Sequence, residues 1–375
     1  MYSAARYLMA VSVAGCAANS TTDPTAVAQS QYRIIDISAT VTPDGRTHLA
    51  YVEKSNAHSA LIYTSKSLSG AWSPPRDLGK SARRPSIVAD AKGGVHLVYE
   101  SNGGAGQTPG VIYRKLESSW SELVDISETT GGGNTPTITV FGNSVSALYI
   151  AQNDLVRTDL SSSGWTPPLL VGTESFADAR PHAHRDIVVW ATSKTPDTKD
   201  IAIASLTGDA SDSLIVATGW LDDAPVAALG PDGSIHVAAW ATDGRWEPKS
   251  TVMYRVRTGG SWGVIDTVSA NVDWPGDPTI VVDGDGTVHL AYQAGDIPEI
   301  ALDPASHVWY SRKDRGSNWT TPCAMTPPGK QSFEPQLVKN SDSSVSLYFV
   351  AHQGRSWTLE ETPIKRGELP CLTIE

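Results

Sequence analysis

The residues with the clearest chemical potential stand directly before a recurring proline. The pairs that precede it are Arg83-Arg84, Asn134-Thr135, Ala179-Arg180, Asp223-Ala224, Gly276-Asp277 and Phe333-Glu334. Arg84 and Arg180 carry guanidinium groups, which bind carboxylates through two parallel hydrogen bonds. Asp223, Asp277 and Glu334 carry carboxylates, which accept hydrogen bonds from hydroxyl groups or take part in acid–base chemistry. If these positions converge, we expect a site for an anionic sugar; the alternative is a set of structural salt bridges or solvated charges.

Two histidines and a loop tryptophan add further candidates. His182 and His184 alternate in the stretch ARPHAHRD, so both point to one side of a strand. Such a pair binds a metal ion or acts as a base with its partner. Because no third ligand stands nearby, we predict no metal, and we assign no cofactor to the chain. Trp246 and Glu247 lie in a loop outside the repeat register, and a loop tryptophan is typical of surfaces that stack on sugars.

Other histidines and tryptophans recur too regularly to be catalytic. The phrases PDGRTHLAY, AKGGVHLVY, PDGSIHVAAW and GDGTVHLAY place a histidine at 48, 96, 236 and 289. A tryptophan recurs in the same repeat, at positions 72, 120, 165, 262 and 319. Since equivalent positions around a ring cannot converge on one substrate, we predict that these residues hold the architecture together.

The elements that must position the candidates form a repeat. Its units begin near residues 37, 85, 136, 181, 225, 278 and 335, and each holds four short runs of β-branched and aromatic residues between turn residues. Four strands per unit at this period are typical of a β-propeller blade. We therefore predict an all-β fold, a seven-bladed β-propeller of four-stranded antiparallel blades.

Ring closure and the cysteines leave specific expectations. The last blade is completed either by the final run PCLTI (370–374) or by YRIID (32–36) as an N-terminal clasp. Cys323 and Cys371 end the similar tripeptides TPC and LPC in neighbouring units. Equivalent outer-strand positions of neighbouring blades should place their Cα atoms beyond the roughly 7 Å limit for a disulfide. We expect two free, mostly buried thiols.

The N-terminal sequence and the composition indicate where the protein is located and which partners it can have. Residues 1–15 read as a lipoprotein signal peptide, residues 16–31 as a flexible tether with lipidated Cys16, and residues 32–375 as the propeller. The formal net charge is −11 and there is no basic run, which argues against nucleic acid. We expect membrane contact only through the lipid anchor, at the outer membrane or cell surface, facing the periplasm or the exterior.

The phrases GGVHLVYE…VIYRKLESSWSELVDIS and GTVHLAYQ…VWYSRKDRGSNWTTPCAMT resemble the sialidase-like, or BNR-type, bacterial propeller superfamily. They are similar also to seven-bladed bacterial lectins whose blades end in G-W-S-x-x-x-x-L. The resemblance covers about residues 37–375 and implies a propeller with a carbohydrate partner. The F-R-I-P element and the Asp boxes of sialidases do not occur in the sequence, so no catalytic residue is carried over.

Three functions remain in view. The first is a cell-envelope propeller that binds glycans at its loop face, either at the mouth of the channel or between blades through exposed tryptophans. The second is an exo-acting glycoside hydrolase or polysaccharide lyase on an acidic glycan, where hydrolysis needs two carboxyls about 5 to 9.5 Å apart. The third is a protein-interaction scaffold in the envelope.

Overall fold

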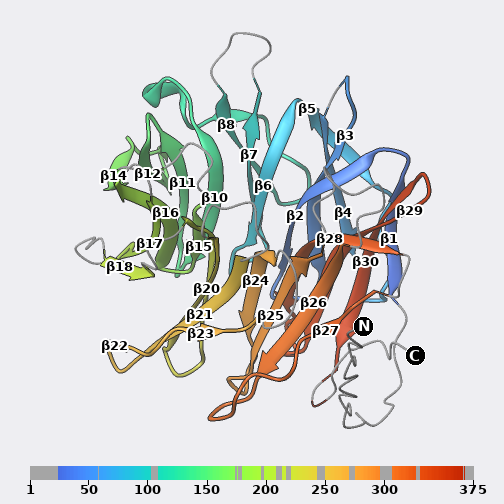
Figure 1. Ribbon diagram of the computed structural model, residues 1–375. Coiled ribbons are helices and arrows are strands. Elements are labelled where there is room, and N and C mark those ends of the chain that lie inside the picture. The colour runs from blue at the N-terminus through green and yellow to red at the C-terminus, as the bar shows by residue number, and fades with distance from the viewer. Residues whose placement is uncertain are drawn as a thin grey trace, which may run out of the picture.

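Short alternating apolar runs, broken by Gly, Asp and Pro turns, make each repeat a four-stranded antiparallel sheet. The computed structural model describes residues 24–57, 59–102, 109–173, 175, 180–195, 198–207, 213–216, 221–242, 250–269, 275–295, 306–326, 330–365 and 367. The sheets radiate around one axis as seven blades (Figure 1). Blades 4 and 5 are joined into a nine-stranded sheet by one parallel pair, Lys199 with Leu221. The predicted seven-bladed β-propeller is therefore confirmed.

Each blade runs outward from the axis in sequence order. The innermost strands are β2 (Arg33–Val41), β6 (Ala82–Ala89), β10 (Asn134–Phe141), β15 (His182–His184), β19 (Leu221–Leu229), β24 (Gly276–Val282) and β28 (Gln331–Lys339). The second strands are β3 (Thr47–Lys54), β7 (Val95–Ser101), β11 (Ser144–Ala151), β16 (Ile187–Thr195), β20 (Ile235–Thr242), β25 (Val288–Ala294) and β29 (Val345–Gln353). The third strands are β4 (Ser59–Lys66), β8 (Gly110–Leu116), β12 (Asp154–Ser161), β17 (Thr198–Ser205), β21 (Ser250–Thr258), β26 (His307–Lys313) and β30 (Ser356–Ile364).

The outer strands are shorter and in places split. They are β5 (Arg76–Lys80), β9 (Val124–Asp125), β13 (Gly164–Trp165) with β14 (Leu169–Gly172), β18 (Ser213–Val216), β22 (Ser261–Trp262) with β23 (Asp266–Thr267), β27 (Cys323–Ala324) and β1 (Thr25–Ser30). A 3-10 turn, η1 (Glu128–Thr130), links the second and third blades. In the part of the chain described, no helix is long and apolar enough to cross a membrane.

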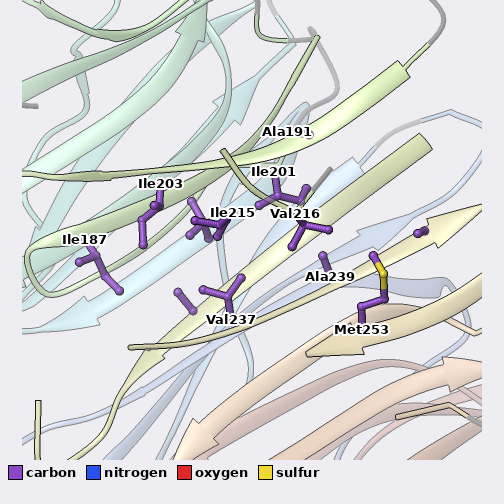
Figure 2. Close-up of a cluster of buried hydrophobic side chains, with 12 residues drawn as sticks. Ile187, Ala191, Ile201, Ile203, Ile215, Val216, Val237, Ala239 and Met253 are labelled. Atoms are coloured by element: carbon purple, nitrogen blue, oxygen red, sulfur yellow. The ribbon is translucent and has the colours of Figure 1, made fainter. Parts of the chain in front are cut away.

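The core lies between blades. In Figure 2, the isoleucine side chains of blade 4, such as Ile187, Ile201 and Ile203, face the smaller Val237 and Ala239 of blade 5. All five are buried, and the same kind of cluster recurs at the other blade junctions. Burying branched side chains against small ones lets two twisted sheets approach closely, so these contacts supply most of the hydrophobic stabilisation.

The repeated histidines join two strands of one blade. Nδ1 of His96 lies 2.8 Å from the Tyr113 hydroxyl, and its Nε2 lies 3.1 Å from Oδ2 of Asp90 in the preceding turn. His48, His236 and His289 contact a tyrosine of the third strand in the same way. Burial lowers the pKa of His48 and of His236 to about 4, which keeps these two rings neutral at pH 7. The predicted architectural role of these histidines is therefore confirmed.

The repeated tryptophans pack between blades. Tyr63 meets Trp120 of the next blade edge-to-face at 5.1 Å, and Tyr113 meets Trp165 at 4.8 Å. Trp120 is buried, and Trp72, Trp165, Trp262 and Trp319 are half-buried against the core clusters. Because these rings pack against other blades, they do not form the exposed sugar-stacking sites that we expected of a lectin with repeated sites between blades.

The ring is closed by a segment that the sequence did not single out. β1 pairs antiparallel with β30 and forms the outer strand of the last blade (Figure 1). YRIID belongs instead to the first blade, because β2 begins at Arg33. The predicted tether is therefore wrong for residues 25–30, which pair in the sheet; residues 1–23, Cys16 and the run 370–374 lie outside the described residues.

The prediction of two free thiols is wrong for Cys323, which is disulfide-bonded. The prediction assumed that Cys371 lies on the outer strand of the last blade, but β1 occupies that position. The chain after β30 passes beside blade 6 instead, where the carbonyl of Gly367 lies 3.5 Å from Nη2 of Arg312 on β26. Cys371 lies outside the described residues.

Two glycines at the same outer-strand position offer a test of the packing between blades. A Cβ on Gly172 would lie 2.5 Å from Cζ2 of the buried Trp190, whereas a Cβ on Gly79 would meet only the Tyr99 hydroxyl at 3.6 Å. We expect Gly172→Ala to lower the free energy of unfolding by roughly 1–3 kcal/mol and Gly79→Ala to leave it nearly unchanged. Urea unfolding measures both, and equal effects would contradict the close approach of blades 3 and 4.

Candidate functional site

Six innermost strands share one unusual backbone feature. A residue with φ between +44° and +53° stands at the same place in each, and the residues are Asp36, Arg84, Thr135, Ala224, Asp277 and Glu334. The pairing register of the strand shifts at each of these points, as it does at a β-bulge. A left-handed non-glycine residue costs about 1–3 kcal/mol. Because the bulge recurs around the ring it is architectural, and only the side chain that it presents differs between blades.

These side chains converge at one mouth of the central channel. Together with Arg180 of blade 4 they line a cavity of about 550 Å³, and we call the seven the mouth ring: Asp36, Arg84, Thr135, Arg180, Ala224, Asp277 and Glu334. The structure therefore brings together four of the predicted residues at this mouth, Arg84, Arg180, Asp277 and Glu334, while His182 and His184 line the same cavity farther along the channel. Blades 6, 7 and 1 contribute an unbroken arc of carboxyl groups to this ring.

Asp36 is the member of the mouth ring that the sequence did not reveal. The other members of the ring directly precede a proline in the sequence, whereas Asp36 precedes Ile37. The spacing of the repeat, which places the start of the first unit at Ile37, was the signal that identifies Asp36 as the equivalent residue.

Both arginines of the mouth are already paired with carboxylates. Nη1 of Arg180 lies 3.0 Å from Oδ1 of Asp277, across the intervening blade, which contributes only Ala224 to the ring. Nη1 of Arg84 lies 3.4 Å from Oε2 of the buried Glu100. The alternative of structural salt bridges therefore applies to Arg84 and Arg180, and neither guanidinium faces the channel without a carboxylate.

Asp223 is not part of the channel lining. Its Oδ2 lies 2.7 Å from Nζ of Lys199 on the third strand of the previous blade. The bulge directs the next residue, Ala224, toward the axis instead. Asp223 therefore helps to join blades 4 and 5, and the prediction that it faces the mouth is wrong.

Glu334 is the carboxyl group most altered by its surroundings. Burial, followed by the negative charges of Asp36 and Asp277, raises its pKa to about 7, and Arg180 and Arg33 only partly oppose this. Within the described ranges Glu334 makes no hydrogen bond, whereas Asp36 accepts one from the backbone N–H of Arg84 at 3.1 Å. Near neutral pH the carboxyl group of Glu334 is therefore partly protonated. It can donate a hydrogen bond when protonated and accept one when ionised.

His182 has a structural role. Its Nδ1 accepts a hydrogen bond from the backbone N–H of Ala227 in the next blade at 3.2 Å. Thr137 and Thr279 make the same bond to the following blade from the equivalent position. Burial lowers the pKa of His182 to about 3, so the ring stays neutral.

His184 lies near the opposite end of the channel from Arg180. Burial, with the nearby Arg185 and Lys339, lowers its pKa to about 4. Among the residues that the structure describes, no group of three or more His, Cys, Asp or Glu side chains is placed to hold a metal ion. Trp246 and Glu247 lie outside the described residues.

Comparisons with known proteins support the fold. No protein-family model matches the chain, and no curated protein matches it in sequence. A polysaccharide lyase described as a PL25 ulvan lyase has a TM-score of 0.60 at 12% identity, over 90% of this chain and 96% of that chain. The α-L-arabinofuranosidase of Fusarium graminearum, solved with an iminosugar inhibitor, has a TM-score of 0.53 at 11% identity, over 93% and 99%.

A fungal alcohol oxidase of the AA5 family, solved with copper, has a TM-score of 0.56 at 13% identity, over 91% of this chain and 77% of that chain. At such identities the likeness shows the fold alone. The chain is thus a seven-bladed β-propeller.

The structural role of His182 can be tested by substitution. His182→Ala leaves the buried N–H of Ala227 without an acceptor, and we expect a loss of roughly 1–3 kcal/mol in the free energy of unfolding. His182→Thr restores the acceptor found in other blades, so it should lose clearly less. Urea unfolding at pH 7 measures both variants, and equal losses would contradict this role.

The altered acidity of Glu334 predicts a pH dependence of stability. Its pKa is about 7 in the folded state against an ordinary 4.5, so its contribution to stability is present below pH 4.5 and is lost as pH rises through 7. We expect Glu334→Gln to gain stability relative to the wild type between pH 4.5 and 8. Urea unfolding across this range measures the difference, with Glu122→Gln on the outer rim as the control for removing one charge. A difference that does not change with pH would contradict the assignment.

Proposed function

We propose that this protein binds a carbohydrate at the mouth ring. The observation that carries the proposal is the arrangement of the ring: an architectural bulge repeats around the channel, and its side chains differ from blade to blade. A binding site needs this combination, because a rigid backbone holds unlike polar groups around one space. Asp36 and Glu334 offer oxygens to sugar hydroxyl groups at one end of the central channel, and the channel along its whole length encloses about 550 Å³.

The fold comparisons favour the same class of ligand without deciding it. Two of the similar structures are described as a polysaccharide lyase and an arabinofuranosidase. The alcohol oxidase shows that the same fold carries other chemistry, so the proposal rests on the mouth ring. Together with the lipidation predicted at Cys16, the proposal describes a lipid-anchored glycan-binding propeller of the cell envelope.

A second candidate function, exo-acting hydrolysis of a glycan, is favoured by Glu334. A carboxyl group with a pKa near 7 beside the carboxylate of Asp277 resembles the acid and base pair that such hydrolysis requires. Under this alternative, Glu334 protonates the leaving oxygen and a neighbouring carboxylate activates water or attacks the sugar. Release of reducing ends from a bound glycan, lost in Glu334→Gln with binding retained, would support hydrolysis over binding alone.

The binding proposal is tested on a glycan array with the purified full-length protein. We expect binding to a subset of glycans, weakened at least about tenfold in Glu334→Ala, because the unpaired carboxyl at the channel wall is removed. The matched control, Glu122→Ala, removes an exposed carboxyl from the outer rim of blade 2 and should bind as the wild type does. Binding that survives in Glu334→Ala would place the ligand elsewhere, and no binding at all would favour an envelope protein as the partner.

A further inference from the structure

The charge of the ligand can be inferred from how the charges of the mouth are paired. Arg84 is held by Glu100, and Arg180 is held by Asp277. An acidic sugar that enters the mouth must therefore compete with a protein carboxylate for each of these cations.

The carboxyl groups are less fully matched. The carboxylates of Asp277, Glu334, Asp36 and Asp223 all act on Arg180 and raise its pKa. Arg33 also acts on Glu334, and its guanidinium lies 5.9 Å from the ring centroid of Trp357. Asp36 is bonded to a backbone N–H and Glu334 to nothing in the described part of the chain, so both carboxyl groups keep unused acceptor positions.

The carboxyl groups with unused acceptor positions also lie on one side of the cavity. Asp277, Glu334 and Asp36 come from three consecutive blades and line one side of the same space. A cationic group beside this arc gains attraction from two or three carboxyls at once, while an anionic group meets their repulsion. A low-dielectric channel wall strengthens both effects relative to open water.

From this geometry we infer that the mouth ring selects a glycan carrying an amino group and rejects acidic glycans. The inference rests on the proposed carbohydrate function and gives its ligand a chemical class. In this arrangement an ammonium group lies against the arc formed by Glu334 and Asp36, and neighbouring hydroxyl groups bond to the remaining carboxylate oxygens. The pairing of Arg180 with Asp277 compensates the charge of its guanidinium, so a uronate that reaches the remaining N–H donors also meets the repulsion of the Asp277 carboxylate.

The test compares three tetrasaccharides that share a β-1,4-linked pyranose backbone and differ in charge: glucosamine, glucose and glucuronate. Isothermal titration calorimetry of the full-length protein at pH 7, where Glu334 is partly ionised, at low ionic strength and with EDTA present, measures each affinity. We expect the glucosamine tetramer to bind about fivefold or more tightly than the glucose tetramer, and the glucuronate tetramer to bind least. The preference should shrink as salt is added, because it arises from charge.

Two variants connect the preference to named residues. Glu334→Gln should reduce the preference for glucosamine over glucose, while Glu122→Gln should retain it. Asp277→Asn frees the guanidinium of Arg180 and should raise the affinity for glucuronate. A preference that is unchanged in both mouth variants would overturn the assignment to this site.

The outcomes separate this inference from the proposed function. Glucuronate binding that equals or exceeds glucose binding, or equal binding of glucosamine and glucose, overturns the charge selection and leaves carbohydrate binding standing. If none of the three binds while the array shows other, acidic ligands, the charge selection again fails alone. If neither the tetramers nor the array show binding, both proposals fail.

Discussion

Neighbouring innermost strands are joined by side chains, and the rest of the molecule depends on this constraint. Ser86 accepts a hydrogen bond from the N–H of Ile138, Thr137 from that of Ala183, and Thr279 from that of Leu337. Each bond crosses from one blade to the next, close to the bulge of the innermost strand. The strands therefore stay splayed around an open channel while remaining in register, and in six of the seven blades the bulge turns one side chain toward the axis.

This constraint explains why the site consists of single residues from many blades. The backbone at the mouth is almost the same in the six blades that carry the bulge, so these blades differ at the channel wall mainly in the identity of one side chain each. Asp277, Glu334 and Asp36 make one side acidic, while Ala224 leaves space for the bond between Arg180 and Asp277. The chemistry of the mouth is set by these few choices, and the strain of the bulge is balanced by packing between blades.

The repeat made the fold predictable, because its prolines, histidines and tryptophans report local turns and contacts that every blade repeats. It also located Arg84, Arg180, Asp277 and Glu334 at the mouth, since equivalent positions in a ring converge. It did not reveal that β1 closes the ring, because the residues TAVAQS carry no strong strand pattern and pair only through β30. The pairing of Arg180 with Asp277 likewise depends on the distance between non-adjacent blades, which no local pattern encodes.

We propose that the ligand occupies the mouth ring and not the junctions between blades. A crystal structure of the protein soaked with the best-binding glycan of the array tests this most directly. We expect a sugar whose polar groups contact Glu334 and Asp36 inside the channel mouth. A sugar seated on the outer strands, or between blades beside Trp120 or Trp165, would contradict it.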